Sequence, residues 1–109
     1  MSEAPVLWTL DDRGVATVTL NRPKVNNAYN GEMIQRLHDA MDTLGKEAGL
    51  RVVVLKGNGK HLQAGADLAW INAARVGTPA DNLAVSRATA TAVDRLNRLP
   101  VPVIALVQG

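Results

Sequence analysis

The residues best suited to chemistry lie in one glycine-rich segment, residues 57–70, which reads GNGKHLQAGADLAW. A continuous apolar run at residues 52–55 precedes it, as expected of a strand buried on both faces. Its glycines permit positive φ or close approach of a ligand, and Asp67 suits the start of a helix. Unpaired backbone N–H groups at such a turn can stabilise an oxygen that gains negative charge. The segment therefore indicates either an oxyanion hole or a plain helix start.

The strands that must position this segment are predicted from apolar patterning. Val6–Leu10 and Val15–Leu20 are rich in β-forming residues and flank a polar turn, which predicts an antiparallel hairpin. The strand at residues 52–55 and a further apolar strand at residues 103–107 each follow helical segments, which predicts parallel pairing through right-handed crossovers. The predicted fold class is therefore α/β, with a leading β-hairpin followed by parallel strands with helical crossovers.

Three helices are predicted between these strands. Residues 33–44 have apolar positions at helical spacing, with Asn30 as the N-cap and Gly45 or Gly49 as the stop. A short helix is expected at residues 68–74 and a second long one at residues 80–99. On the first helix, His38 is expected to face solvent. The second long helix is expected to pack through an apolar stripe formed by Leu83, Ala84, Ala88, Ala92, Val93, Leu96 and Leu99.

Composition favours one small soluble domain. The chain has 109 residues, 47% of them apolar, and a formal net charge of +2. It has no basic run with interleaved aromatics, which argues against nucleic-acid binding. The absence of cysteine excludes disulfides and thiolate metal sites and is compatible with a reducing cytosol. No stretch approaches the roughly 20 apolar residues that span a bilayer, and the start lacks the pattern of an export signal. We expect a cytoplasmic protein without a membrane partner.

Three separated segments carry a family resemblance. Residues 21–28 (NRPKVNNA), 62–68 (LQAGADL) and 99–109 (LPVPVIALVQG) together resemble the enoyl-CoA hydratase/isomerase (crotonase) family. Leu62 stands where the family commonly has Phe. The resemblance covers nearly the whole chain but only the N-terminal part of a family member. It implies that residues 1–109 form the N-terminal part of a crotonase-like ββα spiral, truncated before the catalytic glutamates.

The function that the resemblance implies is chemistry on an acyl-CoA thioester. The complete form would stabilise the thioester enolate in an oxyanion hole, with the backbone N–H of Ala66 as one donor. The reaction is expected to be hydration of an enoyl-CoA in fatty acid metabolism, while isomerase, hydrolase and decarboxylase activities stay open. Coenzyme A enters as part of the substrate, with no tightly bound cofactor. The fragment alone is expected to be inactive.

The family resemblance implies that backbone groups and one side chain of this chain contact coenzyme A. Main-chain carbonyls beside small residues can accept from the adenine amine. Arg22 or Lys24 could contact a phosphate of coenzyme A, and Lys24 is preferred because it lies within the family motif. The alternative for each is a surface charge that contacts only water. No proton transfer is assigned to Asp67. The residues that the resemblance implies for coenzyme A binding are Lys24, Ala28, Ala64, Asp67 and Leu68.

The remaining polar and aromatic residues are less informative. His38 and His61 have no carboxylate or thiolate at ligand spacing, so no metal site is expected. Trp70 either borders an acyl pocket or serves packing. The pattern GADLxW also resembles hydratases that act on methylglutaconyl-CoA and isohexenylglutaconyl-CoA. These branched thioesters are therefore candidate substrates beside straight-chain enoyl-CoA.

The sequence also allows a function that is not enzymatic. The 109 residues could form a noncatalytic CoA-binding or protein-interaction module that keeps part of the site. In either case, the faces that a longer family member covers are left exposed, which predicts apolar surface and self-association. The family resemblance likewise implies a homo-oligomer.

Overall fold

The leading hairpin forms where the apolar patterning predicts it. The computed structural model describes residues 4–75 and 77–108, so Gly109 of the third motif lies outside the described residues. Strand β1 (Val6–Leu10) pairs antiparallel with β2 (Val15–Leu20). In β2 the residues Ala16, Val18 and Leu20 are buried and alternate with partly exposed ones, as a half-buried strand requires.

The parallel part of the sheet also matches the prediction. Strands β3 (Val52–Gly57) and β4 (Val103–Ala105) extend the sheet in the order β1-β2-β3-β4, and the β2–β3 and β3–β4 pairs are parallel. The α/β prediction is therefore confirmed. Strand β4 is shorter than the predicted residues 103–107. Beyond β4 the Leu106 N–H donates to the Leu55 carbonyl at 2.9 Å, and the Gln108 carbonyl accepts from the Leu62 N–H of the glycine-rich loop at 3.2 Å.

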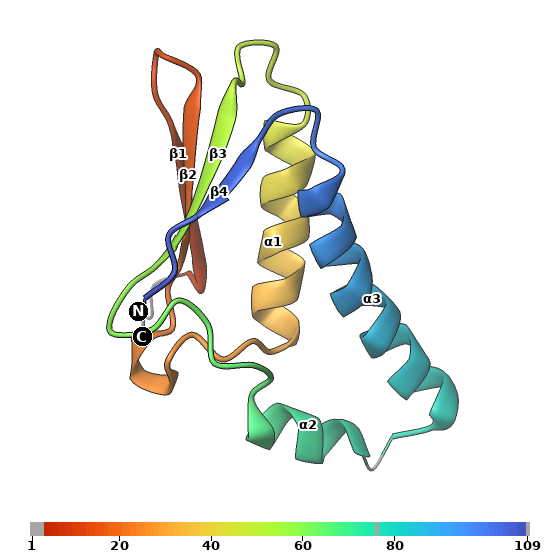
Figure 1. The fold of residues 1–109 in the computed structure, drawn as a ribbon. Helices are drawn as coiled ribbons and strands as arrows, with labels where there is room; N and C mark the ends of the chain where they lie inside the picture. The colour runs from red at the N-terminus through yellow and green to blue at the C-terminus, as the bar shows by residue number, and fades with distance from the viewer. Residues whose placement is uncertain (1–3, 76, 109) are drawn as a thin grey trace.

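Helix α1 (Gly31–Leu44) covers one face of the sheet (Figure 1). The Asn30 side chain accepts a hydrogen bond from the Met33 N–H at 3.0 Å, and Gly45 is the C-cap, so both predicted ends are confirmed. His38, which was predicted to face solvent, is only partly exposed. Its Nε2 lies 3.0 Å from the Ala88 carbonyl and its Nδ1 lies 3.1 Å from Nη1 of Arg95, because α3 packs against this side of α1.

Helices α2 (Leu68–Arg75) and α3 (Pro79–Asn97) follow the predicted boundaries closely. Thr78 begins α3 with a capping box that Asp81 completes. The predicted stripe of α3 is only partly packed: Ala92 is buried, whereas the Val93 side chain is 57% exposed. Figure 1 shows α3 meeting α1 near its C-terminal end and diverging from it toward α2, which leaves the N-terminal part of the stripe, with Leu83 at 51% exposure, away from α1.

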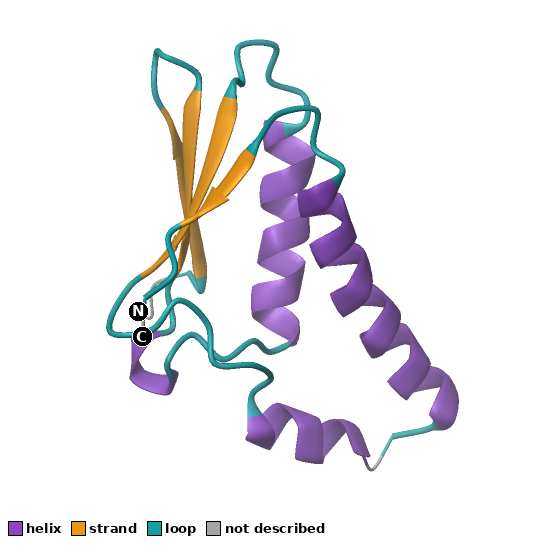
Figure 2. Ribbon diagram, in the orientation of Figure 1, coloured by secondary structure: helices purple, strands orange, loops and turns teal. Residues whose placement is uncertain are grey.

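The core lies between the sheet and α1 (Figure 2), and several large apolar residues remain exposed outside it. The predicted exposure of apolar side chains is confirmed, and self-association stays a prediction. Within residues 4–75 and 77–108, no helix has both the length and the apolar content needed to cross a membrane. The exposed large apolar residues are Leu7, Trp8, Val25, Leu68, Leu83, Val93, Ile104, Leu106 and Val107.

Candidate functional site

The glycines of the loop after β3 are needed where the sequence indicated. Gly59 and Gly65 have φ of +87° and +91°, which disfavours other residues. At Gly57 the chain's own atoms approach closely, whereas approach of a ligand to these glycines stays a prediction. A Cβ on Gly57 would lie 2.7 Å from Nδ2 of Asn27 and 2.8 Å from the Leu62 carbonyl oxygen. The loop therefore folds back tightly onto the segment that carries Asn27.

We expect Gly57→Ala to lower the free energy of unfolding by about 1–3 kcal/mol, because the added methyl meets backbone that cannot move freely. Gly49→Ala is the matched control, since a Cβ at Gly49 meets nothing within 4 Å and its φ is not positive. The control should change stability by no more than about 0.5 kcal/mol. Urea unfolding of the two variants measures the difference, and equal stabilities would contradict the close packing at Gly57.

Asn27 joins two loops that are distant in sequence. Its side chain is fully buried, and Nδ2 donates to the carbonyl oxygens of Asn58 at 2.9 Å and His61 at 2.8 Å. Its Oδ1 accepts from the Arg22 N–H at 2.7 Å. All hydrogen-bonding groups of this side chain are therefore used, which is how a buried amide is tolerated. Consequently the glycine-rich loop is held against residues 22–28.

Ala66 is held in place by its neighbours. The Tyr29 N–H donates to the Gly65 carbonyl at 2.9 Å, and the Asp67 N–H donates to the Tyr29 carbonyl at 2.8 Å. This is a parallel β-bridge, in which Tyr29 makes both bonds and the N–H of Ala66 points away from it. Within the part of the chain that the structure describes, no group accepts a hydrogen bond from the Ala66 N–H. A preorganised, unpaired donor is the arrangement that an oxyanion hole requires.

A cavity of about 390 Å³ lies beside this donor. Ala66 and Tyr29 line one side of it, and residues of α2 and α3 line the rest. Trp70 borders the cavity and also packs on Tyr29, with ring centroids 5.7 Å apart in an edge-to-face arrangement. Trp70 therefore serves packing and borders a cavity at once, and an acyl ligand in that cavity stays a prediction.

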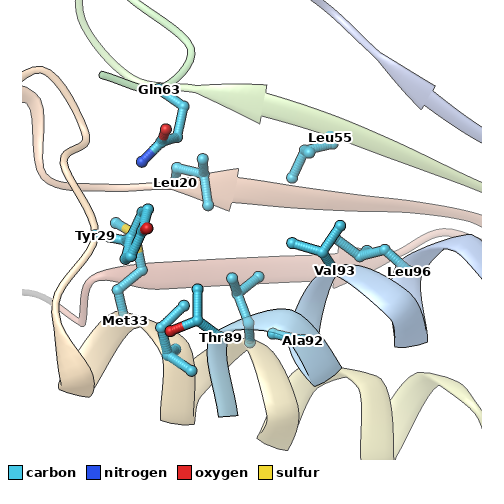
Figure 3. A pocket seen from close by; sticks show the side chains of 11 residues that line it. Leu20, Tyr29, Met33, Leu55, Gln63, Thr89, Ala92, Val93 and Leu96 are labelled. Atoms are coloured by element: carbon cyan, nitrogen blue, oxygen red, sulfur yellow. The ribbon is translucent and has the colours of Figure 1, made fainter. Parts of the chain in front are cut away.

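A second, smaller cavity of about 190 Å³ lies between the sheet and the two long helices (Figure 3). Figure 3 shows Leu20 and Leu55 pointing into it from the sheet, opposite Val93 and Leu96 of α3. Its lining is almost wholly apolar, with Thr89 and the end of Gln63 among the polar groups. It shares Tyr29, Thr89 and Val93 with the lining of the larger cavity beside Ala66.

Asp67 begins α2, as its type and position predict. Its Oδ1 accepts from the N–H groups of Ala69 at 2.9 Å and Trp70 at 3.2 Å, and its Oδ2 lies 3.0 Å from Nη2 of Arg22. The Trp70 N–H, and then the Arg22 guanidinium, hold the pKa of Asp67 below its ordinary value. This carboxylate is therefore kept charged as a helix cap.

Because the folded pKa of Asp67 is depressed, its contribution to stability should be present above the unfolded value of 3.8 and disappear as pH falls through the lower folded value. Asp67→Asn keeps an oxygen for the cap but removes the charge beside Arg22. We expect the stability difference between wild type and Asp67→Asn to be constant near neutral pH and to shrink below about pH 4. Urea unfolding of both proteins across this range measures it, and a difference independent of pH would contradict the ion pair.

The predicted coenzyme A residues gather along the two joined loops. Lys24 lies exposed in the short helix η1 (Pro23–Val25), and Ala64 and Leu68 are also exposed. Ala28 is buried, and its carbonyl already accepts from Nη1 of Arg22. Arg22 is thus engaged with Ala28 and Asp67, which leaves Lys24 as the more accessible of the two cations considered for phosphate. Ligand contact by these residues stays a prediction.

The sequence reasoning missed the polar side chains that hold the site together. Asn27 could have been noticed because two successive asparagines, Asn26 and Asn27, suit the positive φ that both adopt. Gln63 and Gln108 gave no such signal, since their partners are backbone groups. Among the described residues, no group of three or more His, Cys, Asp or Glu side chains is placed to hold a metal ion.

Comparison with known proteins identifies relatives over nearly the whole chain. The profile of a family described as Enoyl-CoA hydratase/isomerase matches residues 11–109. The chain is 36% identical over 99 residues to the 1,2-epoxyphenylacetyl-CoA isomerase of Escherichia coli, and the alignment covers 90% of this chain and 38% of that protein. It is 33% identical over 108 residues to the trans-2-decenoyl-[acyl-carrier-protein] isomerase of Streptococcus mutans, covering 95% and 40% of the two proteins.

Solved structures agree with this result. The crystal structure of an enoyl-CoA hydratase from Shewanella pealeana superposes with a TM-score of 0.91 at 32% identity, covering 96% of this chain and 39% of that one. The structure of an enoyl-CoA hydratase from Mycobacterium smegmatis gives 0.82 at 39% identity, covering 96% and 40%. The chain therefore spans about two fifths of the length of the relatives that it matches.

Proposed function

Because the chain belongs to the enoyl-CoA hydratase/isomerase family, we propose that the complete enzyme binds an acyl-CoA thioester and stabilises its enolate at Ala66. By the complete enzyme we mean residues 1–109 together with any residues that follow them. The observation that carries the proposal is the Ala66 N–H, which has no acceptor among the described residues and belongs to a residue that is held by the Tyr29 bridge and lines a cavity. Hydration of an enoyl-CoA is the reaction we favour.

The chemistry needs negative charge to be stabilised on one oxygen. When water or hydroxide adds to the β-carbon of an enoyl thioester, the electrons of the double bond move toward the carbonyl and form an enolate. A fixed N–H donor within hydrogen-bond distance lowers the energy of that charge without having to reorient. Isomerisation through proton removal passes through the same kind of enolate, so the relatives named above as isomerases are consistent with this role for Ala66.

The groups that activate and deliver water are proposed to come from outside residues 1–109. Asp67 is the carboxylate next to Ala66, and its oxygens already accept from Ala69, Trp70 and Arg22. A general base must be able to reach the water and to change its protonation state, and the depressed pKa of Asp67 works against that role. We therefore expect the 109-residue chain by itself to be inactive.

Calorimetric titration of the 109-residue chain with CoA, beside a hydration assay on a short enoyl-CoA, tests this proposal. Binding by the chain with turnover only by the complete enzyme would support it. Turnover by the chain alone would show that the catalytic carboxylates lie within residues 1–109. Binding without turnover by the complete enzyme would instead favour the noncatalytic CoA-binding module.

Lys24 supplies a sharper test of the coenzyme A half of the site. If its ammonium contacts the 3′-phosphate, Lys24→Ala should weaken CoA binding by about tenfold and leave dephospho-CoA binding nearly unchanged. Lys46→Ala, at an exposed lysine after α1, is the matched control and should affect neither ligand. Equal weakening of both ligands by Lys24→Ala in calorimetry would argue against the phosphate contact.

Homo-oligomerisation and a cytoplasmic location belong to the same proposal. Exposed apolar side chains on α3 and after β4, including Val93 at 57% and Val107 at 81% exposure, offer surface for association. The acyl group is proposed to be a branched glutaconyl-type chain, with a straight enoyl chain as the alternative. The proposal of a branched chain rests on the GADLxW resemblance and on the position of Trp70 beside the cavity.

A further inference from the structure

Gln63 makes an unusual set of contacts for an exposed side chain. Its Oε1 accepts from the Gly65 N–H at 2.7 Å, and its Nε2 donates to the Gly65 carbonyl at 3.0 Å. The same Nε2 donates to the Asn27 carbonyl at 3.1 Å. The carboxamide therefore holds both the N–H and the C=O of one glycine and ties that glycine to the neighbouring loop.

The orientation of this carboxamide follows from its partners. The Gly65 N–H can only donate, so it requires the oxygen of Gln63, and the two carbonyls can only accept, so they require the nitrogen. A flipped amide would oppose like groups at all of these contacts. The network thus has one consistent arrangement.

Because the peptide bond is planar, the restraint on Gly65 also orients the Ala66 N–H. The Gly65 carbonyl and the Ala66 N–H belong to the same trans peptide, so they point in opposite directions within one plane. Two donors, the Tyr29 N–H at 2.9 Å and Nε2 of Gln63 at 3.0 Å, hold that carbonyl. Fixing the carbonyl at two points fixes the direction in which the Ala66 N–H is presented.

No other part of the described chain packs against the position that a Cβ of Gly65 would take. Gly65 has φ of +91°, and a Cβ built on it would meet nothing within 4 Å among the described residues outside its chain neighbours. Glycine has the most freedom to rotate its flanking peptides. Hydrogen bonds must therefore supply the rigidity that side-chain packing supplies elsewhere.

We propose that Gln63 is a positioning residue for the oxyanion donor, acting through the Gly65–Ala66 peptide. This inference rests on the proposed function of Ala66 and adds the group that aims its N–H. Gln63 does not touch the reacting atoms in this role. Its loss should therefore lower kcat more than it raises KM, since an aimed donor matters most once charge has developed.

Backbone ¹⁵N relaxation of the 109-residue chain tests the positioning directly. In the wild type, the Gly65 and Ala66 amides should have order parameters near 0.85, as in rigid backbone, and in Gln63→Met they should fall toward about 0.6. Methionine matches the length of glutamine but forms none of the three bonds. Gln35→Met, at an exposed glutamine of α1, is the matched control and should leave both amides rigid. Unchanged order in Gln63→Met would overturn the proposal.

Kinetics of the complete enzyme separate this inference from the proposed function. We expect Gln63→Met and Gln63→Glu to lower kcat by about tenfold or more, with KM changed by less than about threefold, because a misaimed group loses rate in the transition state. Glutamate keeps the acceptor for the Gly65 N–H but places an oxygen against two carbonyls. If Gln63→Met leaves kcat unchanged while Ala66→Pro lowers it, the inference fails and the function stands. If Gln63→Met loosens the amides but Ala66→Pro leaves kcat intact, the oxyanion role of Ala66 fails.

Discussion

Ala66→Pro is expected to lower kcat of the complete enzyme by about a hundredfold to a thousandfold, the usual effect of removing one oxyanion donor. Proline has no backbone N–H, so the variant deletes the donor itself. The Ala66 N–H has no acceptor among the described residues, so proline removes no internal hydrogen bond there. The expected loss is therefore one of chemistry and not of the bridge between Tyr29 and the loop.

The matched control for this experiment is Ala66→Ser, which keeps the N–H and adds a single hydroxyl. Its kcat should stay within about threefold of the wild type, because the donor is unchanged. Thermal unfolding of both variants shows whether either has lost its fold. Equal kcat values for the proline and serine variants, with both folded, would remove Ala66 from the oxyanion hole.

Asn27→Ala is expected to give the largest loss of stability among the variants considered, about 3 kcal/mol in the free energy of unfolding. The substitution removes the only described side-chain donor to the carbonyls of Asn58 and His61 and the acceptor for the Arg22 N–H. The site is fully buried, so the abandoned groups have no water to replace the amide. Because φ of Asn27 is +59°, alanine also carries backbone strain.

Asn26→Ala separates the backbone strain at positive φ from the loss of the hydrogen bonds of the buried amide. Asn26 has nearly the same backbone conformation, with φ of +55°, but lies exposed. The control should therefore lose about 1 kcal/mol from backbone strain alone. Urea unfolding of the two variants gives the difference that belongs to the buried amide. Similar losses for Asn26→Ala and Asn27→Ala would show that the hydrogen bonds of Asn27 contribute little.

The pH dependence of Asp67→Asn and the coenzyme A binding of Lys24→Ala test other parts of the same two loops, residues 22–28 and the glycine-rich loop. Asp67 holds the start of α2 beside Ala66, and Asn27 holds the opposite end of the glycine-rich loop. Loss of Asn27 should consequently affect the site even at temperatures where the chain stays folded. These residues hold a backbone donor in place, and that geometry is what an oxyanion hole needs.

The positions of the secondary-structure elements could be predicted because their signals are local. The hairpin, the Asn30 cap of α1 and the boundaries of α2 and α3 follow from apolar period, capping residues and turn residues within a few positions of each other. The need for glycine at positions 59 and 65 was likewise readable, because positive φ is a property of single residues.

The partners of the polar side chains were decided by tertiary structure. Arg22 and Asp67 are 45 positions apart, and Arg95 reaches His38 across 57 positions, so no spacing rule connects them. The divergence of α3 from α1 likewise left Leu83 exposed, although it lies on an apolar stripe. The sequence by itself determined the elements and the motif that contains Ala66, since both depend on neighbouring residues. Only the folded chain decided which backbone groups Asn27 holds and that Gln63 reaches the Asn27 carbonyl, because those contacts exist only after distant segments are brought together.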